Sequence, residues 1–256
     1  MENNIGNYAQ HAQYWDWSGH EGQEEQEHWY KFAKKYGENV LIPMCAIGST
    51  AAYMAERGLN VTAFDITPEM ITEGKKRFGD VPRLLFYEAD VRDFNFDIEA
   101  ADFCYCVDFG HISNMVDIEK ALACINRHLR FGGCMAIGTG FWNMDEKSQY
   151  YPEKTFHPFK QVYPGLKVWK SGDTRYEAET GRTYISQRFF AEHDSGKIES
   201  FDHSFYLQSY TSEAWLEAIS KTGFEVKAMH KGADGAPWDD EGWCVIEAVK
   251  KGERPM

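Results

Sequence analysis

The chain has 256 residues, 43% of them hydrophobic, which is enough for one large domain or for one domain that carries an inserted subdomain. Its formal net charge of −13 argues against a nucleic-acid-binding protein, because phosphate binding requires a concentrated basic surface. Six cysteines without a CxxC pair or a His/Cys ligand spacing predict buried, reduced thiols rather than a metal site or a disulfide framework.

The opening residues of the sequence lack the composition of a targeting segment. These residues, MENNIGNYAQ, contain neither a basic nor an apolar run, and no stretch of the chain approaches about 18 consecutive apolar residues. We therefore expect a cytoplasmic protein without membrane contact.

The N-terminal region is rich in aromatic residues. Before residue 22, rings stand among polar residues and glycine at four positions: Tyr8, Tyr14, Trp15 and Trp17. These are too many for a disordered tail, so we expect the rest of the protein to cover them. Apolar residues at helical spacing then predict a helix over residues 23–36 that packs on the sheet.

The next stretch, residues 40–67, has the pattern of a nucleotide-binding βαβ unit. It reads VLIPMCAIGSTAAYMAERGLNVTAFDIT, which predicts a buried strand, a tight turn, a helix and a second strand that ends at Asp65. The small residues Ala46 and Gly48 of the turn let a ligand approach the backbone at the positive N-terminus of the helix. Asp65 can accept hydrogen bonds from both hydroxyls of a ribose.

Strands and helices continue to alternate as far as residue 140, which implies parallel pairing. The pattern predicts helices over 67–78 and 117–129, the second followed by a Gly132-Gly133 turn, and strands over 84–88, 103–107 and 134–138. Asp90 follows the first of these strands, and His111 follows the second.

The pattern changes from residue 141 onward. Residues 141–165 lack a clear period and predict an irregular, partly helical loop. Three segments of strand character with turns between them (167–178, 182–192 and 197–208) predict an inserted three-stranded antiparallel sheet. A helix over 211–222 and strands over 224–229 and 243–249 then close the chain.

These elements divide the chain into four parts. An N-terminal aromatic cap and helix occupy residues 1–38, and a core unit occupies residues 39–140. An inserted lid occupies residues 141–210, and a C-terminal helix and strand hairpin over residues 211–256 complete the core.

The run from Val40 through Asp65 to Met70, with Asp90 and Gly132-Gly133 further along, resembles the class I S-adenosylmethionine (SAM)-dependent methyltransferases that act on small molecules. The resemblance implies an α/β fold with a Rossmann-like, seven-stranded, mostly parallel sheet and an antiparallel hairpin at one edge. It also implies SAM as the cofactor and a small-molecule methyl acceptor. Sugar N-methyltransferases with a similar inserted sheet use it to dimerise, so a homodimer through this sheet is one expectation.

The resemblance further implies which residues hold the cofactor. Asp90 would accept a hydrogen bond from the adenine amino group, and Val91 would offer its backbone amide. The expected cofactor contacts are Tyr14, Met44, Cys45, Ala46, Gly48, Asp65, Ile66, Met70, Asp90, Val91 and Val107.

One part of the motif departs from the family pattern. In the family the first strand usually ends in an acidic residue followed by three alternating glycines, and here these positions read Ile42, Met44, Ala46 and Gly48. Ile42 cannot hold the ammonium of a methionine moiety, and Pro43 removes a backbone donor from a central strand.

His111 is the candidate general base, because an imidazole can take a proton from an attacking amine or hydroxyl near neutral pH. The alternative is a hydrogen-bonding residue that orients its neighbours. Four aromatic or histidine side chains are the expected acceptor contacts: Trp15, Trp17, His203 and Tyr206. The N-terminal rings would either present their faces to a cationic group or only pack their own segment down.

We therefore predict SAM-dependent methyl transfer to an N or O nucleophile of a small molecule. One alternative is a catalytically inactive relative that binds SAM, S-adenosylhomocysteine or a nucleoside as a sensor, which Ile42, Pro43 and Ala46 favour. The other is a nicotinamide-dependent oxidoreductase whose GxGxxG reads Ala46-x-Gly48-x-x-Ala51. The predicted terminal hairpin fits this second alternative less well.

Overall fold

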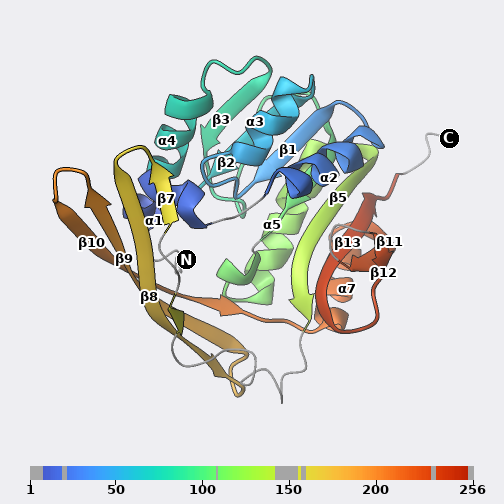
Figure 1. Ribbon diagram of the computed structural model, residues 1–256. Coiled ribbons are helices and arrows are strands. Elements are labelled where there is room, and N and C mark those ends of the chain that lie inside the picture. Colours follow the sequence, from blue (N-terminus) through green and yellow to red (C-terminus); the bar gives the residue numbers. More distant parts are fainter. Residues whose placement is uncertain are drawn as a thin grey trace.

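Two β-sheets carry the fold of this computed structural model, which describes residues 8–18, 22–107, 109–141, 155–156, 160–231 and 235–252. An eight-stranded main sheet forms the core, and a five-stranded sheet, here called the lid sheet, is inserted after strand β5. Figure 1 shows the long strands of the lid sheet standing beside the main sheet.

Five neighbouring strands of the main sheet are parallel to one another. In spatial order they are β5 (Leu129–Phe141), β4 (Ala101–Cys106), β1 (Asn39–Pro43), β2 (Asn60–Asp65) and β3 (Leu84–Glu88). Three antiparallel strands extend the sheet beyond β5: β13 (Gly242–Lys250), β11 (Phe224–Lys231) and the short β12 (Ala236–Pro237). The predicted Rossmann-like sheet and its terminal hairpin are confirmed, with β12 as an addition.

Helices cover both faces of the main sheet, as the alternation of strands and helices requires. On one face lie α2 (Gln23–Lys34) and α3 (Ser49–Glu56), and on the other lie α5 (Met115–His128) and α7 (Ser212–Lys221). Strand β1 shows the two faces clearly, because Leu41 packs with the α5 cluster whereas Val40 and Ile42 pack with the α2 and α3 cluster. A further helix, α4 (Pro68–Phe78), follows β2 and precedes β3.

The prediction of a turn at Gly132-Gly133 is wrong, because both residues lie within β5. Helix α5 ends at His128, and β5 begins at the next residue, Leu129. The pairing of β5 with β4 then shifts from Ala101–Leu129 to Phe103–Cys134. Gly132 has a φ of 73°, so the chain bulges at this point without leaving the sheet.

The lid sheet confirms the predicted antiparallel insertion. Its long strands are β8 (Leu166–Glu177), β9 (Arg182–His193) and β10 (Ile198–Gln208), each antiparallel to its neighbour. Two short strands, β6 (Thr155–Phe156) and β7 (Lys160–Tyr163), also pair with β8. The rest of the loop predicted over 141–165 falls largely on residues 142–154 and 157–159, which lie outside the described residues.

The N-terminal segment joins the lid sheet to the core. It consists of the helix α1 (Tyr8–His11) and the 3₁₀ helix η1 (Ala12–Ser18), and Figure 1 shows it between the lid strands and α4. Tyr14 is 4% exposed against a lid cluster that includes Val168 and Phe189. Ala12 packs instead with Ile47 and Met70 of the core, so the segment contacts both parts.

All six cysteines are free, and all except the half-buried Cys45 are buried. Among the described residues, no helix combines the length and the apolar character that crossing a bilayer requires.

Candidate functional site

In the turn after β1, every second residue adopts the left-handed backbone conformation. Met44, Ala46 and Gly48 have φ values of 53°, 50° and 77°. Only Gly48 adopts this conformation without cost, because a Cβ hinders the left-handed region in other residues. The backbone therefore keeps a path that suits three glycines although two of them are absent. Such strain persists only where the surrounding structure imposes it, and it is concentrated at functional sites.

Asp65 fixes this turn to the end of β2. One carboxylate oxygen accepts a hydrogen bond from the Ala46 amide at 2.9 Å, and the other accepts one from the Thr67 amide at 2.9 Å. Burial raises the pKa of Asp65, and the hydrogen bonds from the Thr67 and Ala46 amides oppose that rise. Each oxygen retains a further lone pair, so the carboxylate can still accept hydrogen bonds from a ligand.

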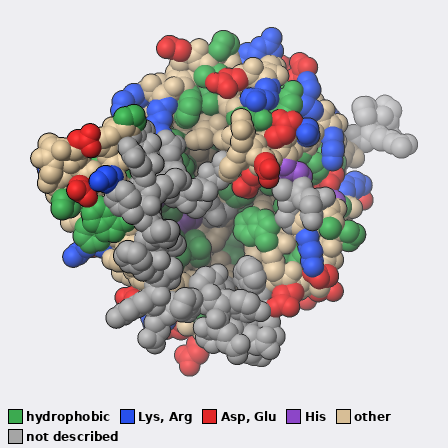
Figure 2. Space-filling view, in the orientation of Figure 1, with side chains coloured by type: hydrophobic (Ala, Val, Ile, Leu, Met, Phe, Trp, Pro, Cys, Tyr) green, Lys and Arg blue, Asp and Glu red, His purple; other side chains and the backbone are tan. Residues whose placement is uncertain are grey.

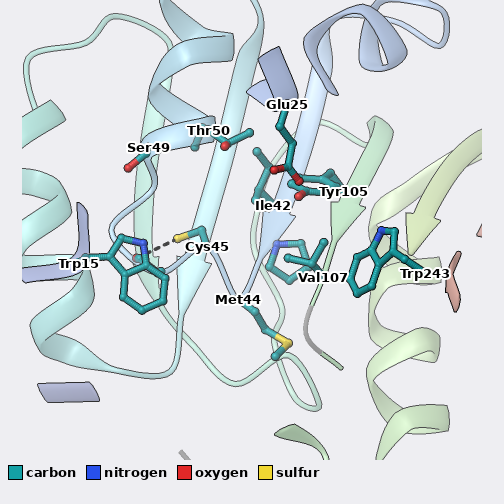
Figure 3. Close-up of a pocket in the computed structure, with 13 residues that line it drawn as sticks. Trp15, Glu25, Ile42, Met44, Cys45, Ser49, Thr50, Tyr105, Val107 and Trp243 are labelled. Atoms are coloured by element: carbon teal, nitrogen blue, oxygen red, sulfur yellow. Dashed lines mark hydrogen bonds between the residues drawn. The ribbon is translucent and has the colours of Figure 1, made fainter. Parts of the chain in front are cut away.

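A first cavity, here called the β4 cavity, opens where β1 and β4 end and α3 begins. Its walls come from η1, α2, β4 and β13 as well as from the turn (Figure 3). The lining residues are Trp15, Glu25, Ile42, Pro43, Met44, Cys45, Ala46, Ser49, Thr50, Ala51, Tyr105, Val107 and Trp243. It is the position at which open α/β sheets bind their ligands.

A second cavity, here called the β2 cavity, lies on the other side of the turn, at the end of β2. Its lining combines the Asp65 carboxylate with apolar side chains and with His111 from the loop after β4. The lining residues are Tyr8, Trp15, Met44, Ala46, Asp65, Ile66, Thr67, Met70 and His111.

The two cavities share three lining residues, Trp15, Met44 and Ala46, and are therefore adjacent; together they are here called the cleft. The face drawn in Figure 2 is hollowed between the lid sheet and the main sheet, with hydrophobic and histidine side chains visible inside. An elongated ligand that lies across the end of β1 would reach both cavities.

Aromatic and imidazole rings from three parts of the chain meet beside the β2 cavity. The Tyr8 hydroxyl and His111 Nε2 are 3.1 Å apart, within hydrogen-bonding distance. The Tyr8 ring also lies 4.6 Å from the His203 ring, and His111 lies 5.0 Å from Phe205, both on β10. The lid sheet therefore reaches the cleft through β10 and the N-terminal segment.

His203 is itself enclosed within this ring cluster, with 2% of its surface exposed. Burial lowers its pKa to about 4, and the neighbouring His111 and Lys170 act in the same direction. The imidazole is consequently neutral near pH 7, which suits packing and orientation rather than acceptance of a proton.

The structure gathers most of the predicted site residues into the cleft. Trp15, Met44, Cys45, Ala46, Asp65, Ile66, Met70, Val107 and His111 all line one or both cavities. Gly48 lines neither cavity. It shapes the turn, and it must remain small because a Cβ at this position would lie 2.4 Å from the Phe86 ring.

Other predicted residues lie elsewhere. Asp90 forms an ion pair with Arg92 at 2.5 Å, which holds the pKa of its carboxyl low against the opposing effect of burial. Val91 is buried in the α5-side core, and Tyr14 donates a hydrogen bond to Glu199 of the lid. Tyr206 lies beneath the Arg182 guanidinium, outside both cavities. The Trp17 side chain lies outside the described residues.

Several cleft residues escaped sequence analysis. Glu25 is one of several acidic residues in its helix, so the sequence does not single it out as a site residue. Tyr105 has the pattern of an ordinary core residue of a buried strand. Trp243 reaches the cleft because β13 pairs with β5, Trp243 opposite Gly140, and because Gly138 leaves room for the indole, which a Cβ there would approach to 2.6 Å. Tyr8 was part of the aromatic N-terminal pattern, which could have suggested a role at the site.

Comparison with known proteins identifies the central part of the chain. Residues 40–133 match a family described as "Methyltransferase domain". A demethylmenaquinone methyltransferase of Clavibacter sepedonicus is 32% identical over 101 residues, which are 40% of this chain and 40% of that protein. A putative methyltransferase of Bacillus subtilis is 20% identical over 190 residues, 73% of each chain. The chain thus spans less than half the length of the first relative.

Solved structures extend the likeness of fold over nearly the whole chain. A SAM-dependent methyltransferase from Clostridium acetobutylicum superposes with a TM-score of 0.76 at 14% identity, over 91% of this chain and 93% of that one. A sugar N-methyltransferase from a Streptoalloteichus species superposes with a TM-score of 0.77 at 15% identity, over 98% and 96%. The inserted lid sheet therefore lies within the region of shared fold.

Proposed function

We propose that this chain, in which residues 40–133 form a methyltransferase domain, is a SAM-dependent methyltransferase that acts on a small molecule. The observation that carries the proposal is the cleft over β1, where the Asp65 carboxylate, a left-handed backbone turn and a candidate base line adjacent cavities. The antiparallel β11 and β13 at the sheet edge favour a methyltransferase over the nicotinamide-dependent alternative.

The residues of the cleft fit the cofactor. Asp65 is placed to accept hydrogen bonds from ribose hydroxyls, and Ile66 and Met70 offer apolar surface beside it. Met44, Cys45 and Ala46 form the turn between the two cavities, where the chain can lie close to an extended ligand. When bound, SAM supplies a methyl group on a positively charged sulfur.

His111 is the residue we assign to proton removal. It lines the β2 cavity, and the Tyr8 hydroxyl at 3.1 Å from Nε2 orients its ring. In methyl transfer from a sulfonium, the carbon–sulfur bond would break with its electron pair left on sulfur as the N or O nucleophile bonds to the methyl carbon, and the His111 imidazole would accept the proton that the nucleophile loses. An acceptor that is already a free amine needs little such help, because placement and exclusion of water lower most of the barrier.

We assign the acceptor to the part of the cleft enclosed by the N-terminal segment and the lid sheet. The fold shared with a sugar N-methyltransferase supports a nitrogen nucleophile. The relatives in sequence include a protein named as a C-methyltransferase of ubiquinone and menaquinone biosynthesis, from Zymomonas mobilis, so an acceptor screen should also include carbon nucleophiles.

A sensor that binds SAM or a nucleoside without turnover is the second candidate. It is favoured by Asp65, whose two oxygens already accept backbone amides, and by the apolar Ile42 at the end of β1. Binding of SAM without methyl transfer to any acceptor in a broad screen would support this candidate.

The same fold suggests how the protein assembles and where it works. We propose a homodimer through the lid sheet, in which β10 is an edge strand and Ile198 is 59% exposed. Light scattering of the purified protein measures this directly, and a monomeric mass would contradict it. Six free thiols suit the reducing cytoplasm.

The test of the proposed function is calorimetric titration of the protein with SAM and with S-adenosylhomocysteine. We expect both ligands to bind. We expect Asp65→Ala to lower the affinity for both ligands by more than about tenfold, because a hydrogen bond to a charged group is lost. Asp97→Ala is the matched control, since Asp97 is exposed and remote from the cavity linings.

Failure of the wild-type protein to bind either ligand would overturn the proposal. Thermal unfolding of each variant must accompany the titration, because Asp65→Ala also removes the acceptor of the Ala46 and Thr67 amides. If binding is found, mass spectrometry of candidate acceptors incubated with SAM identifies the class of nucleophile.

A further inference from the structure

Glu25 enters the β4 cavity from an element outside the matched methyltransferase domain. It lies in the first turn of α2, one helical turn before Trp29, so the two side chains share a face of the helix. Trp29 stacks on Tyr105 of β4 with ring centroids 4.1 Å apart, which holds that face against the sheet. Figure 3 shows the Glu25 carboxylate directed toward Ile42 and Tyr105.

The sheet itself offers no charge at this position. Ile42 points to the same face of the sheet as α2, and its side chain is 4% exposed in an apolar cluster. Among the described residues that line the β4 cavity, Glu25 is the single acidic side chain, and no lysine or arginine accompanies it. Within this described lining, the carboxyl group of Glu25 has no basic side chain opposite it.

The start of helix α3 lines the same cavity and has the complementary polarity. Helix α3 begins at Ser49, and its first turn lines the cavity through Ser49, Thr50 and Ala51. A helix N-terminus carries a partial positive charge and favours anionic groups. With both a carboxyl group and a positive helix end in its lining, the cavity suits a zwitterion, the form of a free α-amino acid group at neutral pH.

The direction of the cleft tells which end of a ligand reaches this cavity. Asp65 ends β2 on one side of β1, and the β4 cavity lies on the other side, because β1 pairs with both β2 and β4. A nucleoside whose ribose lies at Asp65 and whose 5′ substituent crosses the end of β1 therefore brings that substituent toward Glu25.

We propose that Glu25 binds the ammonium of the amino-acid part of the cofactor, a contact that β1 cannot provide because its residue at this site is Ile42. The inference rests on the proposed function and deepens it. The acidic group comes from helix α2 rather than from the sheet, so the N-terminal helix is part of the cofactor site.

The test compares two ligands on three proteins by calorimetry. S-adenosylhomocysteine carries the amino-acid group, whereas 5′-methylthioadenosine has the same nucleoside and sulfur without it. The variants are Glu25→Gln, which removes the charge and keeps helix propensity, and the matched control Glu24→Gln, whose residue is exposed and lines neither cavity.

We expect Glu25→Gln to weaken the binding of S-adenosylhomocysteine on the order of tenfold, as for loss of a charge-assisted hydrogen bond, and to leave the affinity for 5′-methylthioadenosine unchanged. Glu24→Gln should alter neither affinity. Unchanged binding of S-adenosylhomocysteine by Glu25→Gln, or an equal loss for both ligands, would overturn the inference while the proposed function stands. If the wild-type protein binds neither ligand, the proposed function and this inference both fail.

Discussion

Met44 and Ala46 hold left-handed backbone conformations that glycine would adopt without strain, with φ values of 53° and 50°. The Ala46 amide donates to Asp65, so its strained conformation places a hydrogen bond at the ligand site. The strain of these two residues lowers the stability of the folded protein, and the surrounding structure nevertheless holds the turn in one conformation.

Replacement of Ala46 by glycine should stabilise the protein. Relief of the left-handed strain, about 1–2 kcal/mol, exceeds the extra entropy of glycine in the unfolded chain, about 0.4–1 kcal/mol. We expect Ala46→Gly to raise the free energy of unfolding by roughly 0.5–1 kcal/mol in urea denaturation.

The opposite change at Gly48 is the matched comparison. Its φ is 77°, and a Cβ there would lie 2.4 Å from the Phe86 ring, so Gly48→Ala should lower the free energy of unfolding by roughly 1–3 kcal/mol. A loss of stability in Ala46→Gly would show that Ala46 is not left-handed in solution.

His203 should make stability depend on pH. Its pKa falls from 6.5 to about 4 on folding. Between pH 4 and pH 6.5, His203 is therefore protonated in the unfolded chain and neutral in the folded protein. Its contribution to the free energy of unfolding is therefore present above pH 6.5 and declines as the pH falls toward 4, by about 3 kcal/mol in all.

Urea denaturation between pH 4 and pH 7.5 measures this dependence. The variant His203→Gln cannot take up the proton, so its free energy of unfolding should fall less steeply than that of the wild type over the same range. Parallel pH profiles for the two proteins would show that His203 titrates normally in the folded state.

At the scale of elements, the N-terminal segment is the part that closes the cleft. Trp15 of η1 lines both cavities, and Tyr8 of α1 contacts His111 and the lid residue His203. Rings in a short helical segment can supply this much surface because each buries a large apolar area with few rotatable bonds.

Loss of the Trp15 ring should weaken ligand binding. We expect Trp15→Ala to raise the Kd for S-adenosylhomocysteine on the order of tenfold, since an aromatic wall shared by both cavities is removed. Trp169→Ala is the control, because Trp169 stacks on Phe190 of the lid sheet and lines neither cavity. Equal affinities for the two variants would contradict a role for Trp15 in the site.

At the scale of the whole molecule, the two sheets differ in how they are held together. Large apolar clusters cover both faces of the main sheet, whereas the lid sheet packs on a much smaller cluster that includes Tyr14, Val168 and Phe189. Local opening is easier where fewer apolar contacts must be broken.

Hydrogen exchange should therefore separate the two sheets. We expect amides of β1, β4 and β5 to exchange only by global unfolding, and amides of β8, β9 and β10 to exchange at least tenfold faster. Mass spectrometry of peptides from the exchanged protein measures both sets. Equal protection of the two sheets would show that they unfold as one unit. Addition of S-adenosylhomocysteine should slow exchange in the N-terminal segment, which lines the cleft.

The sequence alone was sufficient for the order of elements and for placing several candidate site residues at one edge of the sheet. Alternating apolar segments and turn residues predicted the parallel sheet, the two terminal strands and the three long lid strands to within one or two residues at most ends, and the family resemblance implied that the terminal strands form a hairpin. Asp65, Ala46 and His111 were recognisable because parallel strands end at one edge of the sheet, where ligands bind.

Only the tertiary structure decided which distant side chains complete the cleft. Glu25, Tyr105 and Trp243 come from three separate elements, and their meeting depends on strand order and helix packing, which local patterns do not encode. Asp90, by contrast, stood at a plausible strand end, yet Arg92 engages its carboxylate. Local periodicity reports which face of an element is buried, whereas a site requires knowing what lies against that face.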